Sequence, residues 1–544
     1  MHCLCKMMGM RKLLWTVWFL PVALAAAESP PGWEALADPA KALSKAEKPA
    51  AVAGFLLEAG EDAAVQNFIA SLPDSKADLV NKLRSQTAFY DGDFPGALQS
   101  LELVSTPDPW TVEQKKRIQD LVSRLTKETR SDRVSVRTPV EDAFLASIAL
   151  PALERTAGEA EAFYGVALSS PVRVEIYPDA ESFVKAASLP SDAVDRTGPS
   201  AVRFRCVHLL SPAAKAEGYR WLDEAAGGIH RLAVRKLSGG LAPAWIEEGF
   251  ARRGEDGWRR EGDFVPAPSD FDRLGRAALV NPSTGTQLIG LVGLEPGLKN
   301  LRRYEDVLLA RAEAADAVGF ILKDYGKEKL LALLQAFRRM PREDAFVQIF
   351  GFSEEAMESA WIETLAGRTW TASQGALDRG APVQGAAPSG PEARPFLRQG
   401  DALRDKRQWS GALVQYRKAL AAETDNGAIL VRAARAARET DDMAASEEFL
   451  KRAVEKNPFY VPAFAAYGRI LYDDGRYDDA SRILQEGLEV QPFNPRLHET
   501  LALISMDLGN IPAARRSLEL ALRFDPQSAD LRDLMRHLPK GRAR

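Results

Sequence analysis

The sequence has few of the side chains that bind metal ions or form cross-links. Of its 544 residues, 5 are histidine and 3 are cysteine. Many zinc enzymes place two histidines four residues apart, on adjacent turns of one helix. No two histidines have that spacing here, so a zinc site of this kind is not expected; the five are His2, His208, His230, His498 and His537.

A chain that has lost its signal peptide could not form an internal disulfide bond. Cys3 and Cys5 lie in the first few residues, which leaves Cys206 alone. Cys206 stands in the alternating stretch 202–210, a predicted strand, and we expect it to be a small buried residue. A nucleophilic role would need a base. His208 would share the same strand face, but packing is the simpler expectation.

Long apolar runs are missing after the first residues. Lys6, Arg11 and Lys12 flank a single apolar run, Leu13–Leu24, and small residues follow it at Ala25–Ala27. This order is typical of a signal peptide over residues 1–27, with an uncleaved anchor as the alternative. We therefore expect an exported protein of the periplasm or cell envelope, or an extracellular one, without a membrane span after cleavage.

A strong excess of charge is also absent. The chain has 71 basic and 75 acidic residues and a formal net charge of -4. A nucleic-acid partner is therefore not expected. At roughly 150 residues per domain, the length predicts three or four domains.

Residues 28–130 have the composition and apolar spacing of helices. The stretch FYDGDFPGALQSLE, residues 89–102, resembles the turn between the two helices of a tetratricopeptide repeat. The sequence predicts an all-helical region that is partly of this repeat type.

From residue 131 the pattern predicts a domain that mixes strands and helices. Alternation over 133–137, 171–178 and 202–210 indicates strands of a small sheet. Residues 140–164 are predicted to be helical with a kink or break at Pro151, and residues 179–187 form a further predicted helix. We expect an α+β domain over residues 131–370.

The centre of this domain is the stretch 221–255, which predicts helix, turn and helix. Its turn, LSGG, and the start of its second helix resemble the core of the peptidase MA-like (gluzincin) metallopeptidases. The residues that carry the resemblance are Leu237, Ser238, Gly239, Gly240, Pro243, Trp245, Glu248 and Gly249. Residues 315–337 and 349–361 resemble the late helices of that family. The resemblance implies a gluzincin-like fold.

The family's H-E-x-x-H motif is absent from this chain. By the resemblance, its histidines would fall on Gly227 and Arg231 and its glutamate on Gly228. Glycine offers no ligand atom, and arginine repels a divalent ion. Glu248, at the family's third-ligand position, remains alone. We therefore expect no catalytic residues and no cofactor.

Two other sites can be considered. Glu224, His230 and Glu248 are the candidates for an altered zinc site, although His230 is six residues from Glu224, so the two are not on adjacent turns of one face. The simpler expectation puts Asp223 and Glu224 at the surface and His230 on the helix surface or in helix packing. A paired-carboxylate hydrolase built on Glu247, Glu255 and Asp256 is not supported by any second acidic cluster.

The C-terminal part contains the most specific pattern. Residues 371–392 are rich in Gly, Pro and Ala and predict a flexible linker. From residue 393 a period of 34 residues identifies four tetratricopeptide repeats over 393–526, an α-solenoid, with a capping helix and tail over 527–544. The periodic small residues are Ala412, Ser446, Ala480 and Ala514, then Ala419, Ala453, Gly487 and Ala521.

In this repeat family the first helix of each unit lines a concave groove. The inner positions carry Arg404, Arg435, Arg438, Arg469 and Tyr472. We hypothesise that these arginines bind the carboxylates of an extended or C-terminal acidic peptide. The alternative is that they are ordinary solvated residues offset by nearby acids.

Together these patterns favour an exported, non-catalytic scaffold or protein-recognition protein that binds a protein or peptide through its repeats. An active zinc metallopeptidase with an altered ligand set is the alternative, and zinc is expected only in that case. A purely structural repeat protein is the third possibility.

Overall fold

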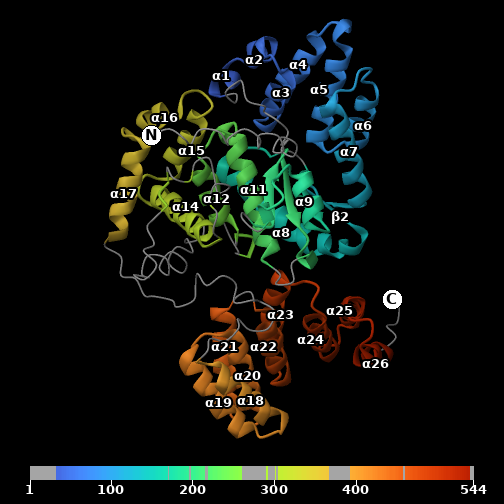
Figure 1. Ribbon diagram of the computed structural model, residues 1–544, viewed down its shortest axis with the longest axis vertical. Coiled ribbons are helices and arrows are strands. Elements are labelled where there is room, and N and C mark those ends of the chain that lie inside the picture. The colour runs from blue at the N-terminus through green and yellow to red at the C-terminus, as the bar shows by residue number, and fades with distance from the viewer. Residues whose placement is uncertain are drawn as a thin grey trace, which may run out of the picture.

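The computed structural model describes residues 32–168, 171–194, 198–214, 219–255, 257–259, 289–291, 294, 301, 304–366, 392–457 and 460–538. The expected signal peptide, 1–27, and nearly all of the expected linker lie outside these residues. Figure 1 shows N-terminal helices above a central domain that contains the sheet, and a helical array below it. The fold is mostly helical with one small mixed sheet.

The N-terminal region is helical up to Arg124, as predicted, but residues 127–130, expected to belong to this helical region, form a strand of the central sheet. Its α5–α6 turn lies at the predicted D-G-D sequence: Gly92 takes a left-handed conformation (φ 77°), and Asp93 caps α6 by accepting the N–H of Gly96. The helices are α1 (Trp33–Ala37), α2 (Pro39–Lys45), α3 (Pro49–Glu58), α4 (Asp62–Ser71), α5 (Ala77–Asp91), α6 (Phe94–Glu102) and α7 (Pro109–Arg124).

The central sheet has five strands in the order β1-β2-β3-β5-β4. The inner strands β2, β3 and β5 are parallel, and the edge strands β1 and β4 are antiparallel to their neighbours. The strands are β1 (Lys127–Arg130), β2 (Val134–Thr138), β3 (Val172–Tyr177), β4 (Ser200–Arg203) and β5 (Cys206–Leu210).

The single strand predicted over 202–210 is a hairpin instead. Phe204 and Arg205 form its two-residue turn, with φ of 53° and 52°. Two successive left-handed residues match the twist of a tight hairpin, a turn that usually contains Gly or Asn. Because neither is present here, no local signal marks the turn.

The two faces of the sheet differ in chemistry. Val174, Ile176, Val207 and Leu209 belong to the main core, which is shared with helices α8 (Phe144–Tyr164) and α11 (Trp221–Ser238). The other face carries polar side chains and lies toward the N-terminal helices, whose core includes Tyr177 and Leu210. The sheet therefore joins two separate cores.

Of the kink or break predicted at Pro151, the break does not occur, because helix α8 continues through this residue. A proline removes the hydrogen bond to the carbonyl four residues earlier, here that of Ser147. Both Pro151 and Ser147 are exposed, so water can satisfy the carbonyl on the outer side of the helix.

The remaining central helices surround α11. Strong local signals set their ends: Asp179 caps α9 by accepting from Ser182, and Gly239 ends α11 in the left-handed region (φ 67°). The helices are α9 (Ala180–Ala186), α12 (Ala244–Gly254), α14 (Tyr304–Asp324), α15 (Lys327–Ala336), α16 (Arg342–Phe350) and α17 (Glu354–Ala366). Short 3-10 helices occur at η1 (Asp74–Lys76), η2 (Val140–Asp142), η3 (Pro212–Ala214) and η4 (Gly257–Arg259).

The C-terminal region consists of paired helices, as the period of 34 residues predicted. A Cβ at Gly400 would lie 2.6 Å from the Tyr416 ring and one at Gly468 would lie 2.4 Å from Leu484, so these glycines allow close helix crossings. The helices are α18 (Arg394–Asp405), α19 (Trp409–Ala422), α20 (Gly427–Arg438), α21 (Met443–Lys456), α22 (Val461–Asp473), α23 (Tyr477–Val490), α24 (Pro495–Asp507), α25 (Ile511–Phe524) and the capping helix α26 (Ala529–His537).

The third and fourth repeats dock on the central domain. Phe144, at the start of α8, packs against Phe493 and Phe524, with ring centroids 5.1 and 5.4 Å away. The Tyr219 N–H donates to the Val490 carbonyl at 3.0 Å, and Arg523 donates to the Glu141 carbonyl. These contacts form the docking contact between array and domain.

Candidate functional site

Two glycines, Gly227 and Gly228, bring α11 close to its neighbours at the positions where the sequence resemblance would put metal ligands. A Cβ built at Gly228 would lie 2.7 Å from Val207 Cγ1, and one at Gly227 would lie 3.0 Å from the Ala251 carbonyl oxygen. Carbon atoms in contact lie about 3.5–4.0 Å apart. These positions therefore have no room for an imidazole or a carboxylate side chain.

Beside them lies a group of charged side chains from α11, α12 and α14, which we call the arginine–glutamate cluster: Glu224, Arg231, Glu248, Arg252 and Arg311. Arg231 donates to Glu248 Oε2. Arg311 places Nε 3.0 Å from Glu248 Oε1 and Nη1 3.3 Å from Glu224 Oε1. The carboxylates that could bind a metal ion thus face guanidinium groups.

Burial and ion pairing act in opposite directions on these acids. Burial alone would raise the pKa of Glu224, but Arg311 and Arg252 outweigh it and lower the pKa to about 2. The pKa of Glu248 is also lowered, because Arg231, Arg311 and Arg252 together outweigh its burial. Both carboxylates therefore stay ionised and paired at neutral pH.

The expectation that Asp223 and Glu224 are surface acids was wrong. Asp223 is 4% exposed and accepts from the Trp258 indole at 3.2 Å, and Glu224 accepts from the Ser200 hydroxyl. The first turn of α11 is covered by β4 and by α14, which the local sequence of α11 does not indicate.

His230 is directed away from the cluster. It is buried, its Nδ1 lies 3.2 Å from the Tyr164 hydroxyl, and α12 passes so close that a Cβ at Gly254 would overlap its ring. Burial lowers the pKa of His230 to about 3, so the ring is neutral in the folded chain. It occupies the position of a packing residue, whereas Glu224 and Glu248 share their arginines elsewhere.

The paired-carboxylate candidates are likewise bound to cations. Glu247 accepts from Arg235 at 2.9 Å, and Glu255 accepts from Arg252 at 2.7 Å. Asp256 lies outside the described residues. The carboxylates of Glu247 and Glu255 thus each have an arginine partner.

A different group brings three potential metal ligands together. Glu175, Cys206 and His208 each offer one ligand atom, and these atoms lie within 4.8 Å of one another; no other such group exists in the described part of the chain. Cys206 is fully buried, as predicted. The signal in the sequence was the period of two in V-R-V-E-I-Y and C-V-H, which puts alternate residues on one strand face.

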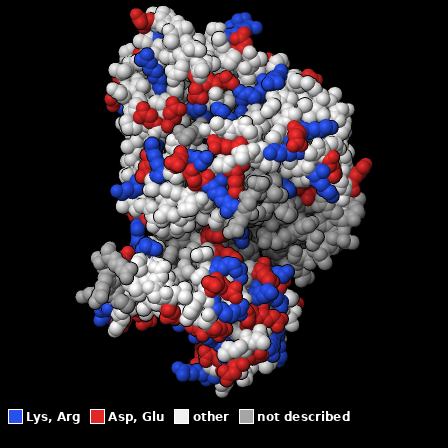
Figure 2. Space-filling view, turned by 180° about the vertical axis from the view of Figure 1, so that it is seen from behind, with Lys and Arg blue, Asp and Glu red and all other residues white. Residues whose placement is uncertain are grey.

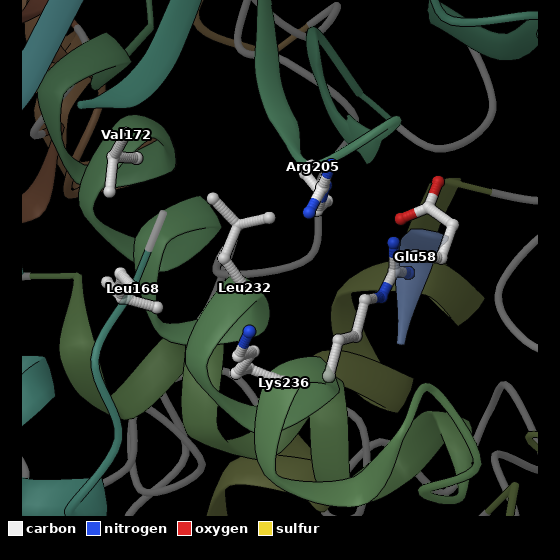
Figure 3. Close-up of a pocket in the computed structure, with 7 residues that line it drawn as sticks. Glu58, Leu168, Val172, Arg205, Leu232 and Lys236 are labelled. Carbon is white, nitrogen blue, oxygen red and sulfur yellow. The ribbon is translucent and has the colours of Figure 1, made fainter. Parts of the chain in front are cut away.

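A pocket at the join of α3, α11 and the sheet is too small for an organic ligand. Figure 3 shows Leu168, Val172 and Leu232 on one side and Arg205 and Glu58 on the other. Its volume is about 20 Å³, enough for about one water molecule.

In the repeats, most of the proposed groove residues have acidic neighbours. Arg404 donates to Asp401 and Asp405 at 2.8 and 2.9 Å. Arg438 and Arg469 both donate to Asp473, at 2.9 and 3.0 Å.

Two groove residues differ from this pattern. Tyr472 lies under the Arg469 guanidinium, 5.4 Å from ring centroid to Cζ. Arg435 is exposed and makes no ion pair within the residues that the structure describes. Arg435 is thus the inner arginine whose charge is not already matched. Figure 2 shows acidic and basic side chains closely mixed over the repeats.

Comparisons with known proteins bear on the repeats alone. Tetratricopeptide-repeat models match residues 397–461 and 471–538. No curated protein matches the chain.

Similar solved structures include one described as a functional characterization of Pseudomonas aeruginosa pilF, with 21% identity over 27% of this chain and 67% of that one, and a TM-score of 0.26. A MamA protein is 19% identical over a match that covers 26% of this chain and 79% of that one, with a TM-score of 0.25. A thermophilic tetratricopeptide-repeat protein of Thermus thermophilus is 19% identical over a match that covers 26% of this chain and 97% of that one, with a TM-score of 0.20.

Among the described residues, no helix has both the length and the apolar character to span a bilayer.

The paired helices, the close crossings at small residues and the two family matches agree on the same segment. The C-terminal region of this chain is therefore an array of tetratricopeptide repeats.

Proposed function

We propose that this protein is an exported, non-catalytic scaffold that recognises a protein partner through its repeat array. The observation that carries the proposal is the array itself, because stacked repeats of this kind form extended concave surfaces that bind partners. The central domain, which resembles the peptidase MA-like fold, would position the array and its partner.

The lack of catalysis is supported by the packing at the motif. Gly227 and Gly228 contact neighbouring elements too closely for ligand side chains, and Arg231 donates to Glu248. A zinc ion beside Glu248 would have to displace three guanidinium groups. This arrangement favours a domain that keeps the helix pair of a peptidase without its metal chemistry.

The partner's chemistry is suggested by the inner surface. Arg435 is exposed and has no ion pair with any described residue, and Arg469, one repeat further along, is exposed beside Tyr472. Arginine side chains of this kind bind carboxylates through two parallel hydrogen bonds. We propose an acidic or C-terminal peptide as the ligand, bound along α20 and α22.

The test measures binding of a peptide library to the full chain. Peptides that end in a free acidic C-terminus would be compared with the same peptides amidated at that end. We expect the doubly substituted chain Arg435→Ala/Arg469→Ala to lose at least tenfold in affinity.

The matched control is Arg482→Ala, which removes an arginine that is 61% exposed on the second helix of the third repeat. Its binding should not change. Equal binding by all three proteins would contradict the proposed groove. Export is tested separately, by locating the chain in fractionated cells and sequencing its mature N-terminus.

A further inference from the structure

The inference concerns the boundary between the N-terminal helices, over residues 32–124, and the central sheet. The main core lies on the other face of the sheet and contains no described residue of these helices. Within the described residues, the chain passes from the helices to the sheet once, at Leu125 and Thr126. The helices can therefore leave the sheet without opening the main core.

Polar groups make several of the bonds across this boundary. Arg173 of β3 donates to the Tyr90 carbonyl at 3.2 Å. Arg137 of β2 donates to the Gly92 carbonyl at 2.9 Å. Both carbonyls lie at the end of α5. Water offers the same kinds of donor and acceptor, so such hydrogen bonds add only modestly to the stability of the closed boundary.

Ion pairs cross the boundary as well. Arg205, in the turn between β4 and β5, lies 2.8 Å from Asp62 Oδ2 and 3.1 Å from Asp91 Oδ1. The side chains of the two acids are 38% and 58% exposed, whereas that of Arg205 is 11% exposed. Solvent therefore screens the acids, while the guanidinium of Arg205 depends on them as long as the boundary is closed.

Closing the boundary also buries polar atoms that make no hydrogen bond with any described residue. They are Arg117 Nε, Arg137 Nη1, Glu175 Oε1 and Arg205 Nε. Such atoms lose their hydrogen bonds to water without replacing them, which opposes closure. Arg117, on α7, has its guanidinium 4.4 Å from the centroid of the Phe204 ring, and burial lowers the pKa of Arg117 to about 10.

The boundary is also incompletely packed. The pocket in Figure 3 lies there, with Glu58 of α3 opposite Leu232 of α11, and its volume admits about one water molecule. Apolar contacts act in the other direction. Tyr177, Phe183 and Leu210 of the central domain belong to the core of the N-terminal helices, and their burial favours the closed state.

We propose that residues 32–124 form a lid that opens as one unit about Leu125 and Thr126 and uncovers the polar face of the sheet. In the closed state the apolar contacts outweigh the buried polar atoms, and in the open state water hydrates those atoms. The main core stays packed in both states. The lid is independent of the proposed scaffold function, which rests on the repeat array.

Cys206 is the probe for the open state. Its side chain is fully buried on the polar face of the sheet, beside Arg173 of β3. In the full chain with Cys3→Ser and Cys5→Ser, Cys206 is the only thiol. Its rate of labelling by an aromatic disulfide reagent measures opening of the lid. We expect this rate to depend on urea less than about half as steeply as hydrogen exchange in α11, because opening the lid exposes less surface than unfolding does.

Hydrogen exchange identifies the part of the chain that opens. The amides of α3, α5 and α7 should exchange together, with the urea dependence of the labelling, while α8 and α11 stay protected. Two results overturn the lid. One is labelling that depends on urea as steeply as exchange in α11, and the other is labelling without joint exchange of α3, α5 and α7.

A substitution at the boundary supplies a second test. Asp62→Asn combined with Asp91→Asn removes both carboxylates from Arg205 and should speed the labelling of Cys206 at least tenfold. The matched control is Asp74→Asn, at an exposed position in η1, which should leave the rate unchanged. Unchanged labelling in the double variant overturns the proposal. Equal acceleration of exchange in α8 and α11 overturns it too, because the helices and the main core would then open together.

Discussion

Replacing Gly228 by alanine tests whether this glycine is needed for close packing of α11 on the sheet. In an ordinary helix interior, alanine stabilises the fold by about 0.5–1 kcal/mol relative to glycine. At Gly228 the new methyl would lie 2.7 Å from Val207 Cγ1 and 2.9 Å from Cγ2. Overpacking of this kind costs about 1–3 kcal/mol. We therefore expect net destabilisation of up to about 2 kcal/mol.

The matched control is Gly158→Ala in α8, where the nearest atom to the added methyl is Arg133 Nε at 3.7 Å. That is an ordinary contact, so the variant should gain about 0.5–1 kcal/mol. Denaturant unfolding would be followed by the fluorescence of Trp221 and Trp245, both buried in the central domain.

A second substitution makes the test specific for the contact. Val207→Ala removes both clashing methyl groups and alone should cost roughly 2 kcal/mol, from about 0.8 kcal/mol per buried group plus a cavity. Combined with Gly228→Ala, it should give a favourable coupling of about 1–3 kcal/mol. If Gly228→Ala stabilises the chain as Gly158→Ala does, the packing argument is refuted.

Three further outcomes are expected. Glu248→Ala removes the buried carboxylate that Arg231, Arg252 and Arg311 share, and should destabilise the central domain by about 3–5 kcal/mol. Glu343→Ala at an exposed position should change the stability by less than about 0.5 kcal/mol in the same unfolding assay. The folded chain holds His230 neutral down to about pH 3, while the unfolded chain takes up the proton near pH 6.5, so His230 alone should lower the stability by about 1.4 kcal/mol per unit below pH 6.5. His230→Gln should therefore reduce the slope of stability against pH by about this amount between pH 6.5 and 5. Phe144→Ala removes the central ring of the docking contact, so the array should separate from the central domain and the radius of gyration in small-angle X-ray scattering should increase. An unchanged radius of gyration would contradict the docking contact.

Elements with strong local signals could be predicted from the sequence. The repeats have a fixed period with small residues at the crossings, and the predicted strand over 171–178 alternates without interruption. The end of α11 was marked by Gly239. In each case the signal is a regular pattern or a single residue that can be read directly from the sequence.

Features that depend on distant neighbours could not be predicted in this way. Asp223 and Glu224 are buried because β4 and α14 cover the start of α11, and Arg311 reaches Glu224 from 87 residues further along the chain. The two-residue turn at Phe204 and Arg205 lacks the usual turn residues, so tertiary packing must impose it. The resemblance to a peptidase gave the positions of Gly227 and Gly228 but not the arginines beside them.

The docking contact holds one end of the repeat array against the central domain. The third and fourth repeats are held at Phe493 and Phe524, while the first repeat, at α18 and α19, lies at the far end of the solenoid in Figure 1. Each repeat contacts mainly its neighbours, so a force on one repeat passes to the next along the array. A force that a partner exerts on the first repeat therefore reaches the central domain at Phe144, at the start of α8, which packs on the sheet.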